Sequence, residues 1–115
     1  LSILETLAQE LDTSLVALFT TDGMKGNRIR ARVFAPLHGV PEDPATGSAA
    51  GCFGAYLIKH GLVRGEPITS VEIEQGMDIR RPSLIHVELA IREGIIEKVW
   101  VAGSAMRVLE GTIRF

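Results

Sequence analysis

Hydrophobic side chains in the first third of the chain recur first at helical and then at alternating spacing. Apolar positions three and four residues apart predict a short amphipathic helix over residues 2–12, with Ser2 as its N-cap and Glu5 as the capping-box partner. The compact apolar run 15–20 is closed by an Asp-Gly pair, so it predicts a strand followed by a turn. Residues 28–34 alternate apolar and arginine positions, which is typical of a strand with one buried face.

The second half of the chain is dominated by alternation with a period of two. Apolar and polar side chains alternate through residues 71–74 and 85–92, and a tight Glu-Gly turn leads into a further strand over residues 95–102. A Gly-Ser pair and a Glu-Gly pair divide residues 103–115 into two further short strands. Short strands joined by tight turns predict an antiparallel meander.

Residues 46–60 interrupt this alternation and predict a helix that is apolar nearly all round. A helix without a continuous polar stripe is buried on every side, so we expect it to be the most buried segment of the chain. Gly47, Gly51 and Gly54 fall within a narrow arc of the helix and cost about 1 kcal/mol each relative to alanine. The arc therefore predicts the close approach of a strand or ligand, and Gly61 is the expected C-cap.

These elements together predict the fold class. It is an α+β fold in which a curved, mainly antiparallel, barrel-like sheet of at least five strands wraps around one central buried helix, with a short N-terminal helix beside it. The sequence shows no internal repeat and no linker, so residues 1–115 are expected to form a single domain.

Composition and charge exclude several classes of function. Of the 115 residues, 46% are hydrophobic and 23% are charged, which is the profile of one globular domain. Twelve basic against fourteen acidic residues give a net charge of -2, which is too balanced for a nucleic-acid or anionic-membrane surface. The single cysteine, Cys52, excludes a disulfide framework and a Cys-rich zinc site, and it favours a cytoplasmic location. No apolar run is long enough for a membrane span, and no nucleotide motif is present.

The candidate chemistry lies just before the central helix, in residues 42–48 (EDPATGS). Asp43 or Thr46 can serve as the N-cap, so the helix should begin within residues 43–47. The first amides of a helix are unpaired and carry partial positive charge, while Gly47 permits close backbone approach and Ser48 adds a hydroxyl. This segment is either a cap for a buried helix or a site for a carboxylate or oxyanion, and the crowding of two carboxylates and two hydroxyls favours the site.

The segment RVFAPLHGVPEDPATGSAAG, residues 32–51, resembles the signature of the phenazine-biosynthesis isomerase (PhzF-like) family. The resemblance implies a diaminopimelate-epimerase-like fold, in which two similar halves each curl a sheet around a central helix. It implies that this chain is the C-terminal half and that the active site lies in the cleft between the halves. Further matches to the family flank the segment downstream, at Gln75-Gly76 and Arg81-Pro82-Ser83.

The resemblance also implies a function, which is cofactor-independent proton transfer on a small carboxylate-bearing substrate. Asp43 is expected to orient the substrate and to help relay the proton, and Ser48 to donate a hydrogen bond at the reacting centre. The amides of Gly47 and Ser48 are expected to hold the substrate carboxylate, and Glu42 and Thr46 complete the expected substrate-binding set. Thr46 stands where the epimerases that share the fold have a cysteine, so a two-thiol racemisation is not expected. No cofactor and no metal are expected.

The expected partners follow from the missing half, which supplies the general acid/base residue of the family. Without that half, we expect exposed apolar surface and a homodimer or larger assembly. The sequence also begins without methionine, which is typical of a piece of a longer protein. A module that binds a small carboxylate or self-associates without turnover is the alternative function. Cys52 is expected to be a small hydrophobic side chain of the core.

Overall fold

The computed structural model describes residues 2–23 and 25–115, without the side chain of Ser2, so the expected N-cap role of Ser2 lies outside the described residues. The predicted helices and the strands up to residue 102 are confirmed. In chain order the elements are α1 (Ser2–Glu10), β1 (Val16–Thr20), β2 (Arg28–Ala35), a short 3-10 helix (Pro36–His38), β3 (Val40–Asp43), α2 (Gly47–Lys59), β4 (Ile68–Gln75), β5 (Ser83–Arg92) and β6 (Ile95–Ala102).

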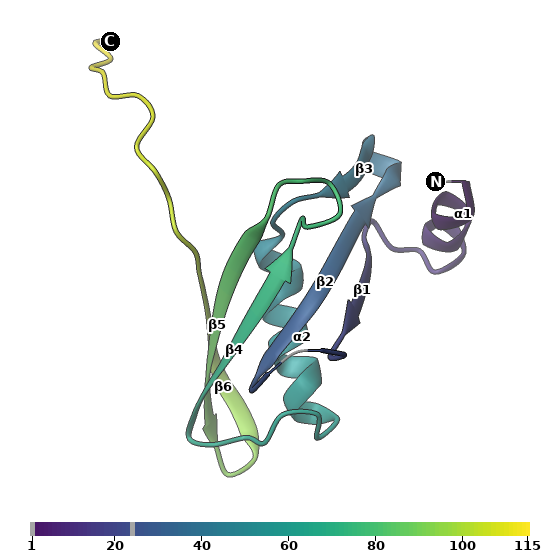
Figure 1. Ribbon diagram of the computed structural model, residues 1–115, viewed down its shortest axis with the longest axis vertical. Helices are drawn as coiled ribbons and strands as arrows, with labels where there is room; N and C mark the ends of the chain where they lie inside the picture. Colours follow the sequence, from purple (N-terminus) through teal and green to yellow (C-terminus); the bar gives the residue numbers. More distant parts are fainter. Residues whose placement is uncertain (1, 24) are drawn as a thin grey trace.

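The six strands form one mixed sheet (Figure 1). Its order is β1-β2-β4-β5-β6, and β3 also pairs with β2. The predicted antiparallel meander is confirmed for β4, β5 and β6, whereas β2 and β4 run parallel. The parallel pair is possible because the chain travels from β2 to β4 through β3 and α2, a connection long enough to return to the same end of the sheet.

The alternation of the sequence separates the two faces of the sheet. The apolar positions of β2, β4 and β5 face α2 and form the core with it. The polar positions face outward, where Arg28 pairs with Glu72 and Glu74 across the parallel strands. Exposed ion pairs contribute little to stability, so burial of the apolar face holds the sheet and helix together. The largest fully buried apolar side chains are Ile29, Val33, Leu57, Val71, Ile73, Val87 and Leu89.

The predicted close approach along the glycine arc of α2 is confirmed. A Cβ built on Gly54 would lie 2.8 Å from Val87 Cγ1 and 3.2 Å from Leu89 Cδ1, so β5 occupies the space that a side chain would need. At Gly51 the same atom would lie 3.6 Å from side chains of β6, which is ordinary contact. The helix ends in a Schellman motif, with His60 as the C-cap and Gly61 at φ +68° directly after it.

Alanine substitutions at Gly51 and Gly54 are expected to change the free energy of unfolding in opposite directions. Gly51→Ala should raise the free energy of unfolding by up to about 1 kcal/mol, because alanine is the better helix former and its Cβ fits. Gly54→Ala should be less stable than Gly51→Ala by about 2 kcal/mol, because its Cβ overlaps the buried Val87. Urea unfolding of both variants measures the difference, and equal stabilities would show that β5 does not limit the helix at Gly54.

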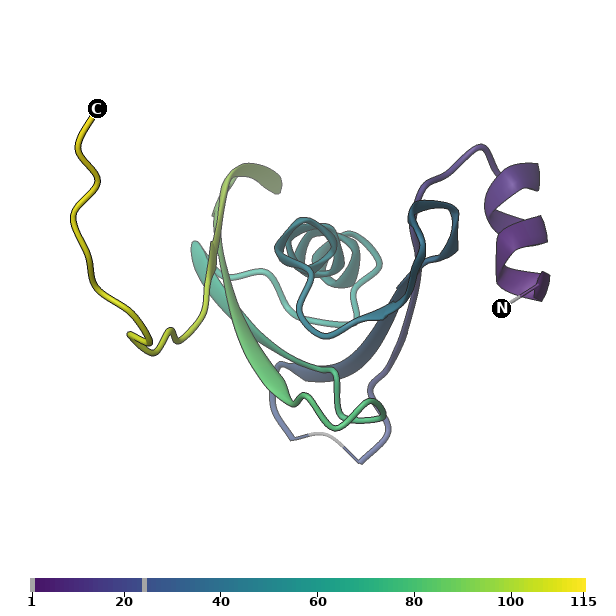
Figure 2. The ribbon, with the colours of Figure 1, turned by 90° about the horizontal axis from the view of Figure 1, so that it is seen from above.

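The expectation that the central helix is buried on every side and is the most buried segment is wrong. Residues spaced along one face of α2 are exposed, namely Ser48, Cys52, Tyr56 and Lys59. Among the described residues, seven of the eight largest fully buried side chains belong to strands. Figure 2 shows the reason, since the sheet curves around α2 as an open trough and is not closed into a barrel. The helix face that looks out of the trough therefore has no strand across it.

The two short strands predicted after residue 102 are also wrong. Residues 103–115 have no regular structure and extend away from the sheet (Figure 1). Alternation alone does not make a strand, because the backbone of a strand needs a neighbouring strand for its hydrogen bonds. The apolar side chains of this segment are highly exposed as a result: Met106, Val108, Leu109, Ile113 and Phe115. In the described part of the chain, no helix is long and apolar enough to cross a membrane.

Candidate active site

The two carboxylates of the motif point to opposite faces of β3. Glu42 and Asp43 are consecutive strand residues, so their side chains leave on opposite sides. Glu42 turns to the charged outer face, where Arg32 Nε and Nη2 donate to its two oxygens at 3.1 and 2.8 Å. This hydrogen bond with Glu42 raises the pKa of Arg32, against the opposing effect of burial. The Glu42 carboxylate is thus paired with Arg32 on the outer face of the sheet, and Asp43 lies on the opposite face of β3.

Asp43 is half-buried and lies beside the start of α2. Thr46 is the N-cap residue of the helix, which confirms one of the two candidates, and Ala50 N donates the first helical bond to Thr46 O at 3.0 Å. The Thr46 hydroxyl makes no capping bond to the helix and donates instead to Asp43 Oδ2 at 2.5 Å. Gly47 and Ser48 are exposed at the first two helical positions, so their amides have no intrahelical partner.

Gln75 is a further residue of this site that the sequence reasoning missed. Its side chain is completely buried at the end of β4, and within the described part of the chain all hydrogen bonds of that side chain go to the loop before α2. A signal for it existed, because Gln75 continues the buried face of Val71 and Ile73 in the alternating pattern. A polar residue at an apolar position is buried at a cost unless it has hydrogen-bond partners, and here the partners are Asp43 and Thr46.

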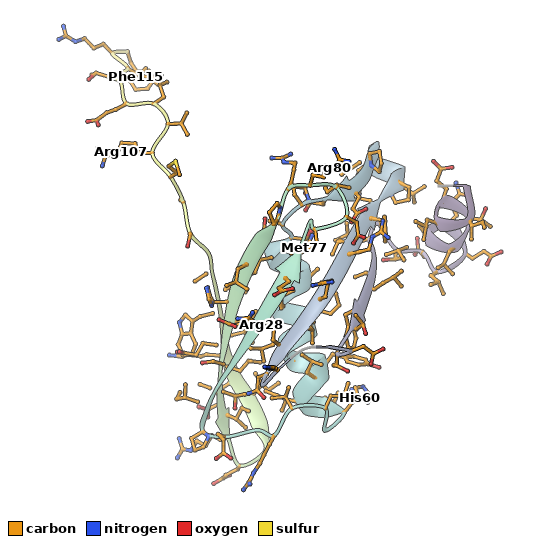
Figure 3. All side chains as sticks on the ribbon, in the orientation of Figure 1. Arg28, His60, Met77, Arg80, Arg107 and Phe115 are labelled. Carbon is orange, nitrogen blue, oxygen red and sulfur yellow. The ribbon has the colours of Figure 1, made fainter. Side chains whose placement is uncertain are left out.

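The β4–β5 loop, residues 76–82, packs against the same segment. Gly76 has φ +79°, and a Cβ built on it would lie 2.2 Å from the Arg81 carbonyl oxygen and 2.8 Å from that of Pro44. The loop therefore supports the residue that follows Asp43. Figure 3 shows Arg80 and Met77 at this end of the molecule, opposite His60 at the far end of α2.

Other candidate residues lie outside this site. Cys52 is exposed on the open face of α2, so the expectation that it is a core side chain is wrong. The reason is the open trough, which leaves that helix face uncovered. His60 packs against Tyr56 with ring centroids 4.2 Å apart. Across the residues that the structure describes, no group of three His, Cys, Asp or Glu side chains is placed to hold a metal ion.

A wide hollow of about 760 Å³ lies on the outer, charged face of the sheet. Residues from four strands line it, among them Arg28, Glu72, His86 and Trp100. These residues alternate with the core positions of the same strands, so the hollow and the Asp43 segment are on opposite faces. Arg28 and Glu72 already pair with each other there, and His86 Nδ1 lies 3.5 Å from Glu72 Oε1. The chemistry of the motif therefore does not coincide with this hollow.

The structure thus defines an α+β domain in which a carboxylate, a hydroxyl and unpaired amides meet at one helix start. The chain belongs to the phenazine biosynthesis-like protein family (PhzC-PhzF), which it matches over residues 4–111. It is 44% identical over 89 residues to trans-2,3-dihydro-3-hydroxyanthranilate isomerase of Pseudomonas fluorescens, covering 76% of this chain and 31% of that protein.

Two further relatives are uncharacterized isomerases. One, of Deinococcus radiodurans, is 40% identical over 107 residues, which is 91% of this chain and 34% of the relative. The other, YddE of Escherichia coli, is 36% identical over 81 residues, which is 70% of this chain and 27% of the relative. The chain therefore spans about a third of the length of the curated relatives that it matches.

Proposed function

We propose that this chain is the C-terminal, substrate-binding half of a cofactor-independent isomerase that transfers a proton on a small carboxylate-bearing metabolite. The observation that carries the proposal is the placement of the Asp43 carboxylate beside the exposed start of α2, in a chain whose relatives are named isomerases. The alternation of β3 aims Asp43 toward the helix and Glu42 away from it.

Two kinds of group are needed for such a reaction, and the helix start offers both. A carboxylate can accept and return a proton, which contributes about 10²- to 10⁴-fold to the rate of a typical enzyme. Helix amides and a hydroxyl can hold the substrate carboxylate or the negative charge that develops on removal of the proton. Asp43 supplies the first group, and Gly47 and Ser48 supply the second. Glu42 also belongs to the expected substrate-binding set, but its carboxylate is held by Arg32 and would contact a substrate at the helix start only after release from that arginine.

The open trough supports a second half of the protein. In a diaminopimelate-epimerase-like arrangement, another half-domain covers the exposed start of α2 and supplies the principal general acid/base residue, to or from which Asp43 helps to relay the proton. Exposed apolar side chains of the edge strand β6 beside the start of α2 support such a cover, because Val99 and Val101 are 41% and 42% exposed and lie next to Gly51, with Val101 also next to Gly47. A second copy of the chain, in a homodimer, is the alternative cover.

The substrate proposed for the assay is trans-2,3-dihydro-3-hydroxyanthranilate, after the name of the relative in Pseudomonas fluorescens. The full-length protein is the form to test, since the principal acid/base residue is expected outside this chain. Conversion of this compound without added metal or cofactor supports the isomerase. Binding without conversion favours the alternative of a non-catalytic carboxylate-binding module.

A glycine-to-valine substitution tests the helix start. Gly47→Val should abolish calorimetric binding of anthranilate to the full-length protein, because the branched side chain blocks approach to the free amides. The fold should survive, since a Cβ at Gly47 lies 3.7 Å from Val101. Gly103→Val is the matched control, because a Cβ there meets nothing within 4 Å, and it should bind as the wild type does. Undiminished binding by Gly47→Val would place the carboxylate elsewhere.

A further inference from the structure

The orientation of the Gln75 side-chain amide is determined by its neighbours. The backbone N–H of Thr46 donates to Gln75 Oε1 at 3.1 Å, and an N–H can face only an acceptor. The other end of the amide, Nε2, donates at 2.7 Å to the carbonyl oxygen of Asp43, which in turn can face only a donor. Both contacts assign the same orientation, so the donating end of Gln75 is fixed.

This orientation fixes the Thr46 hydroxyl as well. Gln75 Nε2 also donates to Thr46 Oγ1 at 2.9 Å, so the hydroxyl is an acceptor on that side. A hydroxyl has one proton, which is then free to point at Asp43 Oδ2, 2.5 Å away. In the part of the chain that the structure describes, Asp43 Oδ1 has no hydrogen-bond partner. The two carboxylate oxygens are therefore unequal, with Oδ2 held and Oδ1 available.

We propose that Gln75 and Thr46 are positioning residues for Asp43: Gln75 directs the Thr46 hydroxyl to Oδ2, so that Asp43 exchanges a proton with the substrate through Oδ1. The inference rests on the proposed function of Asp43 in proton transfer. It also gives Thr46 a role different from direct contact with substrate, because its proton and one lone pair are already engaged. Gln75 is buried behind the loop and acts through Thr46.

Substitutions at Thr46 in the full-length protein test this role, with trans-2,3-dihydro-3-hydroxyanthranilate as substrate. Thr46→Val keeps the shape of the side chain but removes the hydroxyl, and we expect kcat to fall about 10- to 100-fold, the scale of a misplaced catalytic group, while KM stays within about threefold. Thr46→Ser restores the hydroxyl and should recover kcat to within about threefold of the wild type. An equal loss of kcat in both variants would overturn the inference.

Thr69→Val is the matched control, because it also removes the hydroxyl of a threonine that is shielded from solvent. Thr69 is 3% exposed, and among the residues that the structure describes its hydroxyl bonds only to the backbone of Glu66, away from the motif. We expect Thr69→Val to lower Tm at least as much as Thr46→Val does while kcat stays within about twofold of the wild type. If kcat fell as far in Thr69→Val as in Thr46→Val, the loss in Thr46→Val would be due to lower protein stability, and the inference would be overturned.

A double variant separates action through Asp43 from direct contact with substrate. If Thr46 acts through Asp43, adding Thr46→Val to Asp43→Asn should change kcat by less than about threefold, since the carboxylate is already gone. Multiplication of the two single effects would overturn the inference. Wild-type kcat in Asp43→Asn would instead overturn the proposed role of Asp43, and loss in Asp43→Asn with full kcat in Thr46→Val would overturn only the positioning role.

Hydrogen exchange of the side-chain amides tests the geometry independently of any substrate. The sequence contains one other glutamine, Gln9, which is exposed in α1. Nitrogen-15 spectra of the full-length protein should show the Gln75 side-chain amide protons exchanging at least about tenfold more slowly than those of Gln9. Thr46→Val should accelerate the exchange at Gln75, and Thr46→Ser should not. Equal rates for the two glutamines in the wild type would overturn the inference even if no substrate were turned over.

Discussion

Asp43→Asn in the full-length protein is expected to lower turnover of the assay substrate by about 100-fold or more. The substitution keeps the size of the side chain and an oxygen that can accept from the Thr46 hydroxyl, but it removes the group that takes up a proton. The free energy of unfolding should change by less than about 1 kcal/mol, because one hydrogen bond at most is weakened. Initial rates and urea unfolding on the same preparation measure both quantities.

The control for this loss is Asp22→Asn, which removes an exposed carboxylate in the turn after β1, far from the motif in the sequence. Its turnover should equal that of the wild type. Turnover by Asp43→Asn at the wild-type rate would reduce the motif to a structural start of the helix. A large loss of stability in Asp43→Asn with a proportionate loss of activity would lead to the same conclusion.

Gly76→Ala is expected to be the most destabilising of the substitutions considered, and to lower the free energy of unfolding by about 2 to 5 kcal/mol. Its φ of +79° costs an alanine about 1–2 kcal/mol, and its Cβ would overlap two backbone carbonyl oxygens, at Arg81 and Pro44, which adds an overpacking cost of about 1–3 kcal/mol. Relief of the overlap requires movement of the segment next to Asp43. Turnover should therefore fall together with stability.

Gly94→Ala separates the two costs. Gly94 has φ +77° in the β5–β6 turn, but a Cβ there meets nothing within 4 Å, so only the cost of the left-handed backbone applies. We expect a loss of about 1 kcal/mol and unchanged turnover. Urea unfolding of the two variants measures the difference. Equal destabilisation would show that contact between the β4–β5 loop and Pro44 does not hold the motif in place.

The periodic pattern determined the strands and helices because local geometry follows from which positions need to be buried. The alternation in residues 28–34 predicts β2 and its charged outer face, and the spacing of Gly51 and Gly54 predicts the approach of a strand to α2. The EDPATGS segment, residues 42–48, likewise determined that the helix begins at this point and that a carboxylate lies beside it. Each of these features could be predicted because it depends on residues that are close together in the sequence.

Tertiary structure decided that the sheet stays open and that residues 103–115 form no strands. Both depend on which strand lies beside which, and alternation states only that a strand has two faces. The trough stays open because β6 has β5 as a neighbour on one side alone. The exposure of Cys52 follows from that opening, although the composition of the helix by itself predicted burial.

The site shows the same division. The sequence by itself determined the residues of the motif and the order in which strand, cap and helix follow one another. Tertiary structure decided that Gln75, 29 residues beyond Thr46, lies behind the motif and donates a hydrogen bond to the Thr46 hydroxyl. It also decided that Glu42 is drawn to Arg32 on the opposite face of the strand. The physical reason is that a side-chain hydrogen bond between distant segments depends on the packing of α2 against the sheet, which no local spacing encodes.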